Sequence, residues 1–276
     1  MEYSYNDLKK IANECRKNIL EQVYLASSGH IGGSLSCIDI LVTIYFKHAN
    51  IDINNPKWED RDRVILSKGH CSPAFYAVLA EKGFIDKEIL KTFRKLDSIL
   101  QGHPDMKNIP GVDMSSGSLG QGLSVANGMA IAGKMDKKNY KVYCILGDGE
   151  VQEGQIWEAA MTAAHYKLNN VIAFLDYNNL QIDGKVEDVM NIADIADKFK
   201  AFNFNVIEID GHDFEQIDKA IIKAKEEKEK PSIIIAKTIK GKGISFMEDV
   251  AKWHGEAPKE EDYKIAKSEL EIGGVI

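Results

Sequence analysis

The sequence predicts an α/β protein with a doubly wound, mostly parallel sheet and helices on both faces of that sheet. Five short apolar runs look like buried strands, and a plausible helix precedes each run except the first. Three of the runs end in glycine, aspartate or asparagine. Ligands of such sheets bind beyond the carboxyl ends of the strands, so these end residues are the first candidates for a site. The runs are residues 62–70, 141–149, 170–179, 204–213 and 231–239.

The helices are predicted from the spacing of apolar residues. From Leu8 to about Ala26 such residues recur every three or four positions, which is typical of an amphipathic helix. A glycine-bearing break at residues 27–34 separates this helix from a second one, predicted from Ser36 to Phe46. Residues 150–168 are predicted to form one helix between two strands, so that the whole unit is a right-handed crossover.

The domain organisation is expected to be simple. The charged run at residues 223–230 fits the solvated face of a helix before the last strand. The tail after Pro258 is expected to be poorly ordered or to dock on a partner. Because the sequence shows no internal repeat and no low-complexity linker, we expect residues 1–276 to form a single domain.

The composition excludes several classes of function. The 276 residues are 44% hydrophobic and carry a formal net charge of -7, which argues against nucleic acid or an anionic membrane as a partner. No apolar run approaches the roughly 18 residues of a membrane span, and the first residues lack a signal-peptide pattern. We therefore expect a cytoplasmic location. The four cysteines show no CxxC spacing and are expected to be reduced and mostly buried: Cys15, Cys37, Cys71 and Cys144.

Two polar side chains at neighbouring strand ends predict a metal site. Asp148 follows the run 141–149 within the turn Gly-Asp-Gly, and Asn178 ends the next run 30 residues later. With a backbone carbonyl such as that of Leu180, they supply the hard oxygen ligands that Mg²⁺ prefers, phosphate oxygens and water completing the shell. Gly149 would allow a backbone N–H to approach a phosphate, and the following helix would add its positive end. Taken alone, the Gly-Asp-Gly segment is also compatible with a simple tight turn.

Four histidines lie in short glycine-bearing loops, where the backbone can bend around a ligand. They are His30 in SGHIGG, His70 in SKGH, His103 in QGHP and His254 in WHGEAP. Any one of them alone would more simply be a structural loop residue. The loop of residues 115–124, SSGSLGQGLS, has the glycine spacing GxxGxG and is not a dinucleotide-binding fingerprint.

Together these motifs resemble the thiamine diphosphate enzymes, whose cofactor motif runs from GDG through about thirty residues to Asn, and among them the transketolases. The resemblance runs from about Ile11 to about Pro258 and implies thiamine diphosphate with Mg²⁺, or with Ca²⁺ or Mn²⁺ as substitutes. It implies that Asp148, Asn178 and the Leu180 carbonyl hold the metal. The cofactor-binding residues that it implies are His30, His70, Gly117, Ser118, Leu119, Asp148, Gly149, Glu153, Asn178 and His254.

The resemblance also implies an activity, the transfer of a two-carbon ketol unit from a ketose phosphate to an aldose phosphate in the pentose phosphate pathway. His30, His103 and His254 would face the sugar and act as the catalytic histidines, since imidazole donates or accepts a proton near neutral pH. Glu153 resembles the family's interface glutamate, which links cofactor sites across the dimer. The segment WHGEAP differs from the family's usual HGAP by Glu256, which affects the loop after His254.

A second chain is expected. Transketolases supply from a further domain a glutamate that contacts the aminopyrimidine ring of the cofactor, and no second α/β domain follows within these 276 residues. We therefore expect the amino-terminal subunit of a split transketolase that is active only with a carboxy-terminal, pyrimidine-binding partner subunit, in a heterotetramer. Two alternatives stay open: the diphosphate-binding subunit of another thiamine diphosphate enzyme, such as a 2-oxoacid dehydrogenase or another sugar-phosphate ketol transferase, and a non-catalytic, cofactor-binding regulatory chain.

Overall fold

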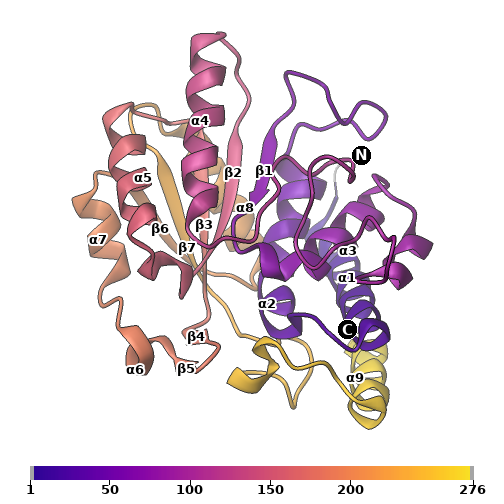
Figure 1. The fold of residues 1–276 in the computed structure, drawn as a ribbon. Coiled ribbons are helices and arrows are strands. Elements are labelled where there is room, and N and C mark those ends of the chain that lie inside the picture. The colour runs from indigo at the N-terminus through magenta and orange to yellow at the C-terminus, as the bar shows by residue number, and fades with distance from the viewer. Residues whose placement is uncertain (1–2, 274–276) are drawn as a thin grey trace.

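The computed structural model describes residues 3–273 and contains a central five-stranded parallel sheet (Figure 1). The strand order is β1-β2-β3-β7-β6, and all four neighbouring pairs are parallel. The predicted fold class is confirmed, and each predicted run contains one strand. The strands are β1 (Arg63–Leu66), β2 (Val142–Gly147), β3 (Val171–Tyr177), β6 (Asn205–Asp210) and β7 (Ser232–Lys237).

Helices cover both faces of the sheet, and each face has its own hydrophobic core. One face packs against α1 (Tyr5–Ala26), α2 (Ile31–Thr43), α3 (Ser72–Lys82) and α8 (Phe214–Glu226). The opposite face packs against α4 (Gln121–Met135), α5 (Gly154–His165) and α7 (Ile195–Ala201). Burial of the sheet on both faces explains why the strands are nearly continuous apolar runs rather than alternating ones.

Local sequence explains where the longest helices begin. Ser4 precedes α1, and its hydroxyl accepts from the Asp7 N–H while the Asp7 carboxylate accepts from the Ser4 N–H, so that a capping box is formed. Asp213 caps α8 by accepting from the N–H groups of Glu215 and Gln216. The acidic first turns of both helices also complement the helix dipole.

The second predicted helix was placed too late in the chain. Helix α2 already begins at Ile31 and is followed by a widened π-turn, Ile44–His48, so Gly32 and Gly33 lie inside it and not in a break. A Cβ on Gly32 would lie 2.9 Å from the Trp253 carbonyl oxygen, and one on Gly33 would lie 2.9 Å from the sulfur of Cys71. These glycines therefore serve close packing of the helix and not chain reversal.

The helix predicted for residues 150–168 is shorter than expected. A 3₁₀ turn, Glu150–Gln152, comes first, Glu153 is extended, and α5 begins only at Gly154. The turn next to Gly149 is thus a short one, and the helix whose positive end was expected there starts five residues further along the chain.

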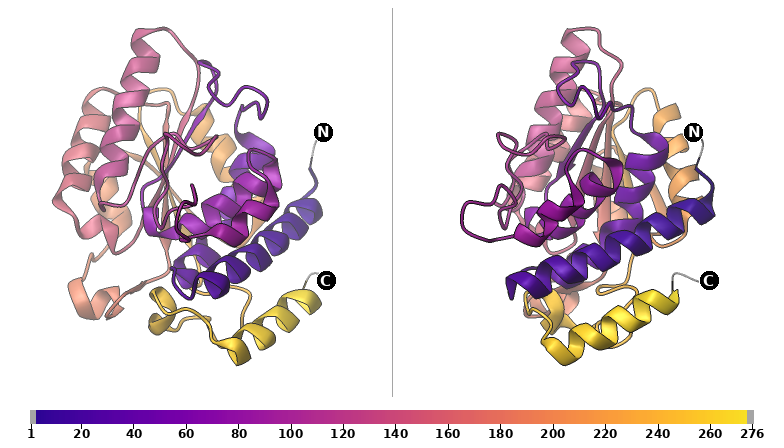
Figure 2. Two further views of the ribbon diagram at one scale, coloured as in Figure 1. Left: turned by 45° about the vertical axis from the view of Figure 1, so that its right-hand side comes forward. Right: turned by 90° about the vertical axis from the view of Figure 1, so that its right-hand side faces the viewer.

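The tail after Pro258 is ordered as far as the structure describes it. It forms α9 (Glu260–Gly273), which lies beside α1 in both views of Figure 2. Tyr263 stacks on Tyr24 with ring centroids 4.0 Å apart, and the Leu270 carbonyl accepts from the Asn13 side chain at 2.9 Å. The prediction of a poorly ordered tail was wrong for residues 259–273, and residues 274–276 lie outside the described range.

The remaining elements are short. A two-stranded hairpin of β4 (Leu180–Gln181) and β5 (Gly184–Lys185) leads into α6 (Val186–Met190). All four cysteines are buried and free, as predicted. Between residues 3 and 273, no helix combines the length and the apolar character that a membrane crossing requires.

Candidate functional site

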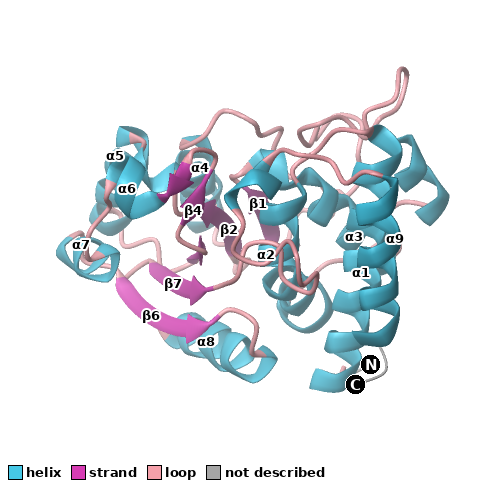
Figure 3. Cartoon of the chain, turned by 90° about the horizontal axis from the view of Figure 1, so that it is seen from below, coloured by secondary structure: helices cyan, strands magenta, loops and turns pink. Residues whose placement is uncertain are grey.

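A cavity of about 530 Å³ lies at the carboxyl edge of the sheet, the edge that Figure 3 views from below. The strand ends meet there because β2 and β3 are in register, with Gly147 opposite Asp176. Every predicted site residue except Ser118 lines this cavity: His30, His70, His103, Gly117, Leu119, Asp148, Gly149, Glu153, Asn178, Leu180 and His254. Ser118 is exposed between two lining residues. The volume is in the usual range for a small-ligand pocket.

The predicted metal ligands converge at the ends of β2 and β3. Asp148 is 3% exposed, and its two carboxylate oxygens accept from the N–H groups of Gly149 and Asn179. The Asn178 side-chain oxygen accepts from the Leu180 N–H at 3.1 Å. Asn179 has a φ of 59°, so the chain turns sharply and brings the Leu180 carbonyl back to the same cavity.

The donor chemistry of this set fits a hard divalent cation. One carboxylate and two neutral oxygens leave room for oxygens of a bound ligand and for water, as Mg²⁺ prefers. Burial and the neighbouring Asp176 raise the pKa of Asp148 to about 6, a shift that a cation beside the carboxylate would reverse. Among residues 3–273 no cluster of three or more His, Cys, Asp or Glu side chains is arranged to hold a metal by itself.

A buried ion pair supports the turn that carries Asn178. The Lys68 ammonium donates to the Asp176 carboxylate and, at 2.9 Å, to the Gly33 carbonyl. Asp176 is fully buried and also accepts from the hydroxyls of Ser36 and Thr238 and from the Asn178 amide. These contacts fasten the end of β3 to β1, α2 and β7.

Three of the predicted histidines form one cluster. The ring centroids of His30 and His70 are 5.0 Å apart, and those of His30 and His254 are 5.4 Å apart. Burial lowers the pKa of His30 to about 4 and that of His254 to about 3. It also lowers the pKa of His103. Neutral imidazoles at physiological pH can both donate and accept, which suits binding of sugar hydroxyls.

Two ring nitrogens of this histidine cluster show which hydrogen bonds its rings can offer to a ligand. The Nδ1 of His30 is buried and has no hydrogen-bond partner among the described residues, so it remains available to a ligand. The Nδ1 of His254 lies 2.9 Å from the Lys240 ammonium. Because an ammonium group only donates, this nitrogen accepts and Nε2 of His254 carries the proton.

Lys240 is a site residue that the sequence analysis missed. It is 2% exposed, lines the cavity and donates at 2.9 Å to the Leu180 carbonyl. Burial lowers its pKa to about 8, while Asp148 acts in the opposite direction. A buried ammonium beside the proposed metal ligands provides the local positive charge that a diphosphate needs in a chain of net charge -7.

The loop with Gly117 and Leu119 covers one wall of the cavity. Gly69, next to His70, approaches it so closely that a Cβ there would lie 2.5 Å from the Ser116 hydroxyl. A Cβ on Gly117, which has a φ of 148°, would lie 3.1 Å from the ring of His103. The SKGH, QGHP and SSGSLGQG segments, which are far apart in the sequence, are therefore packed around one space.

Glu153 occupies the rim of the cavity. It is exposed, in contrast to the buried Glu150 three residues earlier.

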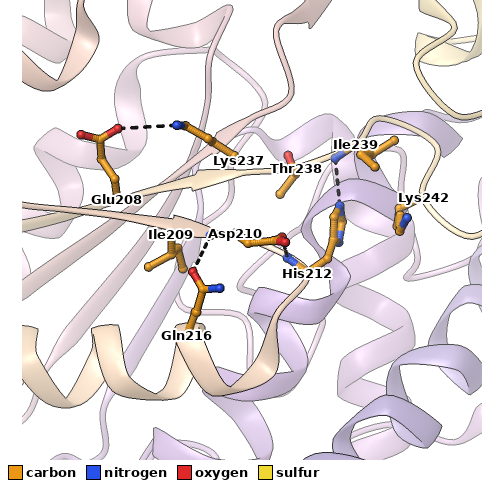
Figure 4. Close-up of a pocket in the computed structure, with 9 residues that line it drawn as sticks. All are labelled: Glu208, Ile209, Asp210, His212, Gln216, Lys237, Thr238, Ile239 and Lys242. Carbon is orange, nitrogen blue, oxygen red and sulfur yellow. Dashed lines mark hydrogen bonds and ion pairs between the residues drawn. The ribbon is translucent and has the colours of Figure 1, made fainter.

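A second hollow, drawn in Figure 4, lies beside the ends of β6 and β7. Its central His212 is already engaged on both ring nitrogens, with Asp39 at 2.8 Å and with the Ile239 N–H at 2.8 Å. Gln216 accepts from the Asp210 N–H. The polar groups of this hollow are thus engaged in hydrogen bonds that hold the ends of β6 and β7 together.

The chain is similar to known transketolases and to single subunits of transketolases. A family model described as "Transketolase, thiamine diphosphate binding domain" matches residues 8–273. The chain is 47% identical to the 6-deoxy-6-sulfo-D-fructose transketolase subunit SqwG of a Clostridium species, over 97% of this chain and 98% of that protein. It is 45% identical to one of the apulose-4-phosphate transketolase subunits of Phocaeicola vulgatus, over 92% of this chain and 90% of that protein.

Longer transketolases match over part of their length. Human transketolase is 43% identical over 90% of this chain and 39% of its own length. The solved transketolase of Campylobacter jejuni superposes with a TM-score of 0.92 at 37% identity, over 99% of this chain and 44% of that one. The chain thus spans less than half of these two proteins. The family match and the identities agree: the chain belongs to the transketolase family and comprises its thiamine diphosphate binding domain.

Proposed function

We propose that the chain is the amino-terminal, diphosphate-binding subunit of a two-chain transketolase. The enzyme transfers a two-carbon ketol unit from a ketose phosphate to an aldose phosphate, with thiamine diphosphate and Mg²⁺. The observation that carries the proposal is the shared cavity, where the oxygens at two strand ends, a buried lysine and neutral histidines come together. The names of the relatives as transketolase subunits support it. Residues 1–276 would act as one domain in the cytoplasm.

The cavity fits the diphosphate end of the cofactor. Asp148, Asn178 and the Leu180 carbonyl would hold Mg²⁺, while Lys240 and the unpaired Nδ1 of His30 offer polar partners. When bound, thiamine diphosphate supplies an electron sink for cleavage of the carbon–carbon bond next to a carbonyl. Gly149 and His70 would contact the diphosphate, and Gly117, Ser118 and Leu119 would lie near the rings.

The histidines would orient the sugar. His30, His103 and His254 approach the cavity from three different loops, and their lowered pKa values keep them neutral. His30 and His103 can therefore each donate to one hydroxyl and accept from another, whereas His254, whose Nδ1 accepts from Lys240, can donate to the sugar through Nε2.

A partner chain would complete the site. Leu119, Ile182 and Glu153 lie at the rim of the cavity, and Leu119 and Ile182 are exposed to 36% and 63% although they are apolar. Apolar side chains at a rim favour coverage by another protein surface. We propose that this partner is a carboxy-terminal, pyrimidine-binding subunit and that the assembly is a heterotetramer, with Glu153 at the interface.

The preferred sugar is a separate part of the proposal. Two similar proteins are named for apulose-4-phosphate and for 6-deoxy-6-sulfo-D-fructose. A ketose that carries a sulfonate in place of the phosphate is therefore a second candidate for the donor, beside the ketose phosphates.

The test is a transfer assay on the chain co-expressed with its partner. Ketose phosphates and sulfonated ketoses are offered as donors with an aldose phosphate, and the shortened aldose product is measured. Transfer with one of these donors is expected. A complex that binds thiamine diphosphate but cleaves only 2-oxoacids would refute the proposed activity, and a complex that binds it without any turnover would favour a regulatory role.

A further inference from the structure

Glu150 is a buried acid in the cavity wall to which the proposed reaction assigns no role. It is 2% exposed and is the first residue of the 3₁₀ turn after Gly149. One carboxylate oxygen accepts from the Gly120 N–H at 2.9 Å and from the Ser67 hydroxyl, and the other accepts from the Gly147 N–H at 3.0 Å. A single side chain thus joins the ends of β1 and β2 to the segment before α4.

These contacts replace the missing cap of α4. The residue at its N-cap is Gly120, with a φ of 84° and no side chain to accept from the first N–H groups of the helix. Such groups need acceptors when they are buried. Here Glu150 accepts from Gly120, and the Ser67 hydroxyl, which donates to Glu150, accepts from the Gly122 N–H at 3.2 Å. The cap is therefore supplied by a carboxylate and a hydroxyl from two other segments.

The segment directly before Gly120 forms a wall of the cavity. Gly117 and Leu119 line the cavity. Two hydrogen bonds anchor this short stretch. Before it, the Ser116 N–H donates to the Pro104 carbonyl at 3.3 Å; after it, the Gly120 N–H donates to the Glu150 carboxylate. The charge-assisted contact to Glu150 is the stronger of the two anchors.

We propose that Glu150 is the positioning residue of this loop. Acting through Gly120 and Ser67, it holds Gly117 and Leu119 in place against the cofactor cavity and so determines how tightly thiamine diphosphate binds. The inference rests on the proposed function, because the loop matters only if the cavity takes that cofactor.

Replacement of one carboxylate oxygen of Glu150 by an amide nitrogen is the most selective test of these contacts. In Glu150→Gln the side chain keeps its size, but it is neutral and has a single acceptor oxygen. The contacts to Gly120 and Ser67 therefore lose their charge assistance, or, if the amide is reversed, an N–H group faces the Gly120 N–H; either orientation weakens the anchor of the loop. The loop then samples conformations that do not bind. The apparent Kd equals the intrinsic Kd divided by the fraction of competent molecules, so a fall of that fraction to about one tenth raises Kd about ten-fold.

The experiment compares the full-length wild type, Glu150→Gln, Ser67→Ala and Asp213→Asn. The last is a matched control, because Asp213 is also a carboxylate that caps a helix but it lies outside the cavity. Hydrogen exchange of peptides covering residues 115–124 is measured without cofactor. Thiamine diphosphate is then titrated at saturating Mg²⁺ into each variant in complex with the partner subunit, and thermal unfolding is recorded for each variant.

Faster exchange confined to residues 115–124 and an about ten-fold higher Kd are expected for Glu150→Gln, with a smaller change of the same kind for Ser67→Ala. Asp213→Asn keeps an oxygen that can cap α8, so it is expected to leave the loop exchange and the Kd unchanged and to change the unfolding temperature little. Unchanged loop exchange and unchanged Kd in Glu150→Gln would overturn the inference, as would a uniform loss of protection over the whole chain. Failure of the wild-type complex with its partner to bind thiamine diphosphate would instead refute the proposed function, and the loop exchange would still decide whether Glu150 holds the loop.

Discussion

Replacement of Lys68 by methionine tests the support of the site. The substitution keeps the volume of the side chain but removes the ammonium, so the fully buried Asp176 carboxylate loses its cation. Removal of one partner of a buried pair typically costs about 3–5 kcal/mol of stability. Asp176 keeps the donors of Ser36, Thr238 and Asn178, which favours the lower end, while the Gly33 carbonyl loses a hydrogen bond worth about 1 kcal/mol.

The assay is urea unfolding of the cofactor-free chain, followed by far-UV circular dichroism. With a slope of about 3 kcal/mol per molar urea, the expected loss lowers the midpoint by about 1 M or more. Lys167→Met is the matched control, because the side chains of Lys167 and Glu229 are 67% and 66% exposed, and an ion pair screened by solvent contributes little to stability.

A double variant separates charge from packing. In Lys68→Met with Asp176→Asn neither partner leaves an unpaired buried charge, so the double variant is expected to be more stable than the sum of the two single losses predicts. A loss below about 1 kcal/mol in Lys68→Met, or strict additivity of the two losses, would refute the reasoning.

Three further predictions concern the site itself. Asp148→Ala is expected to abolish Mg²⁺-dependent binding of thiamine diphosphate in calorimetry; unchanged affinity would refute the ligand assignment. Lys240→Met should raise the Kd for the cofactor about ten-fold or more, as expected for a lost charged hydrogen bond. Lys242 lies outside the cavity, so Lys242→Met should leave this Kd unchanged. Equal effects of the two substitutions would exclude a direct role of Lys240 in cofactor binding. Folding lowers the pKa of His30 to about 4, so neutral His30 favours the folded state. This contribution to the free energy of unfolding is complete above about pH 6.5 and is lost as the pH falls toward 4. It amounts to about 1 kcal/mol, because the side chain is partly exposed. His30→Gln should flatten this decline of the unfolding temperature, and an unchanged slope would contradict the assigned pKa.

Much of the fold was predictable because the strands are buried on both faces. The runs around Val142, Val171 and Ser232 are mostly apolar, and each stands alone between helical patterns. The start of α2 was not predictable from the same pattern, because Gly32 and Gly33 indicate a break by propensity alone. Their place inside a helix is decided by tertiary packing against Trp253 and Cys71.

The candidate site was predicted mainly from residues in short glycine-bearing motifs. Asp148 and His70 lie in such motifs, and the structure brings both to one cavity. Lys240 was missed because a lysine in a surface-like KGKG sequence is ordinarily solvated, and only the fold shows that it is buried. The sequence does contain a signal for the buried ion pair. Asp176 is a charged residue within an apolar strand, and such a residue is rarely buried without a partner of opposite charge.

The most direct test of the central claim is a titration of this chain with its partner subunit. A fixed amount of the chain is mixed with increasing amounts of the partner at saturating thiamine diphosphate and Mg²⁺, and ketol transfer is measured at each ratio. No transfer by either chain alone is expected, and the activity should rise with the partner until it saturates at a fixed ratio. Transfer by this chain alone, or no transfer at any ratio although the cofactor is bound, would contradict this expectation.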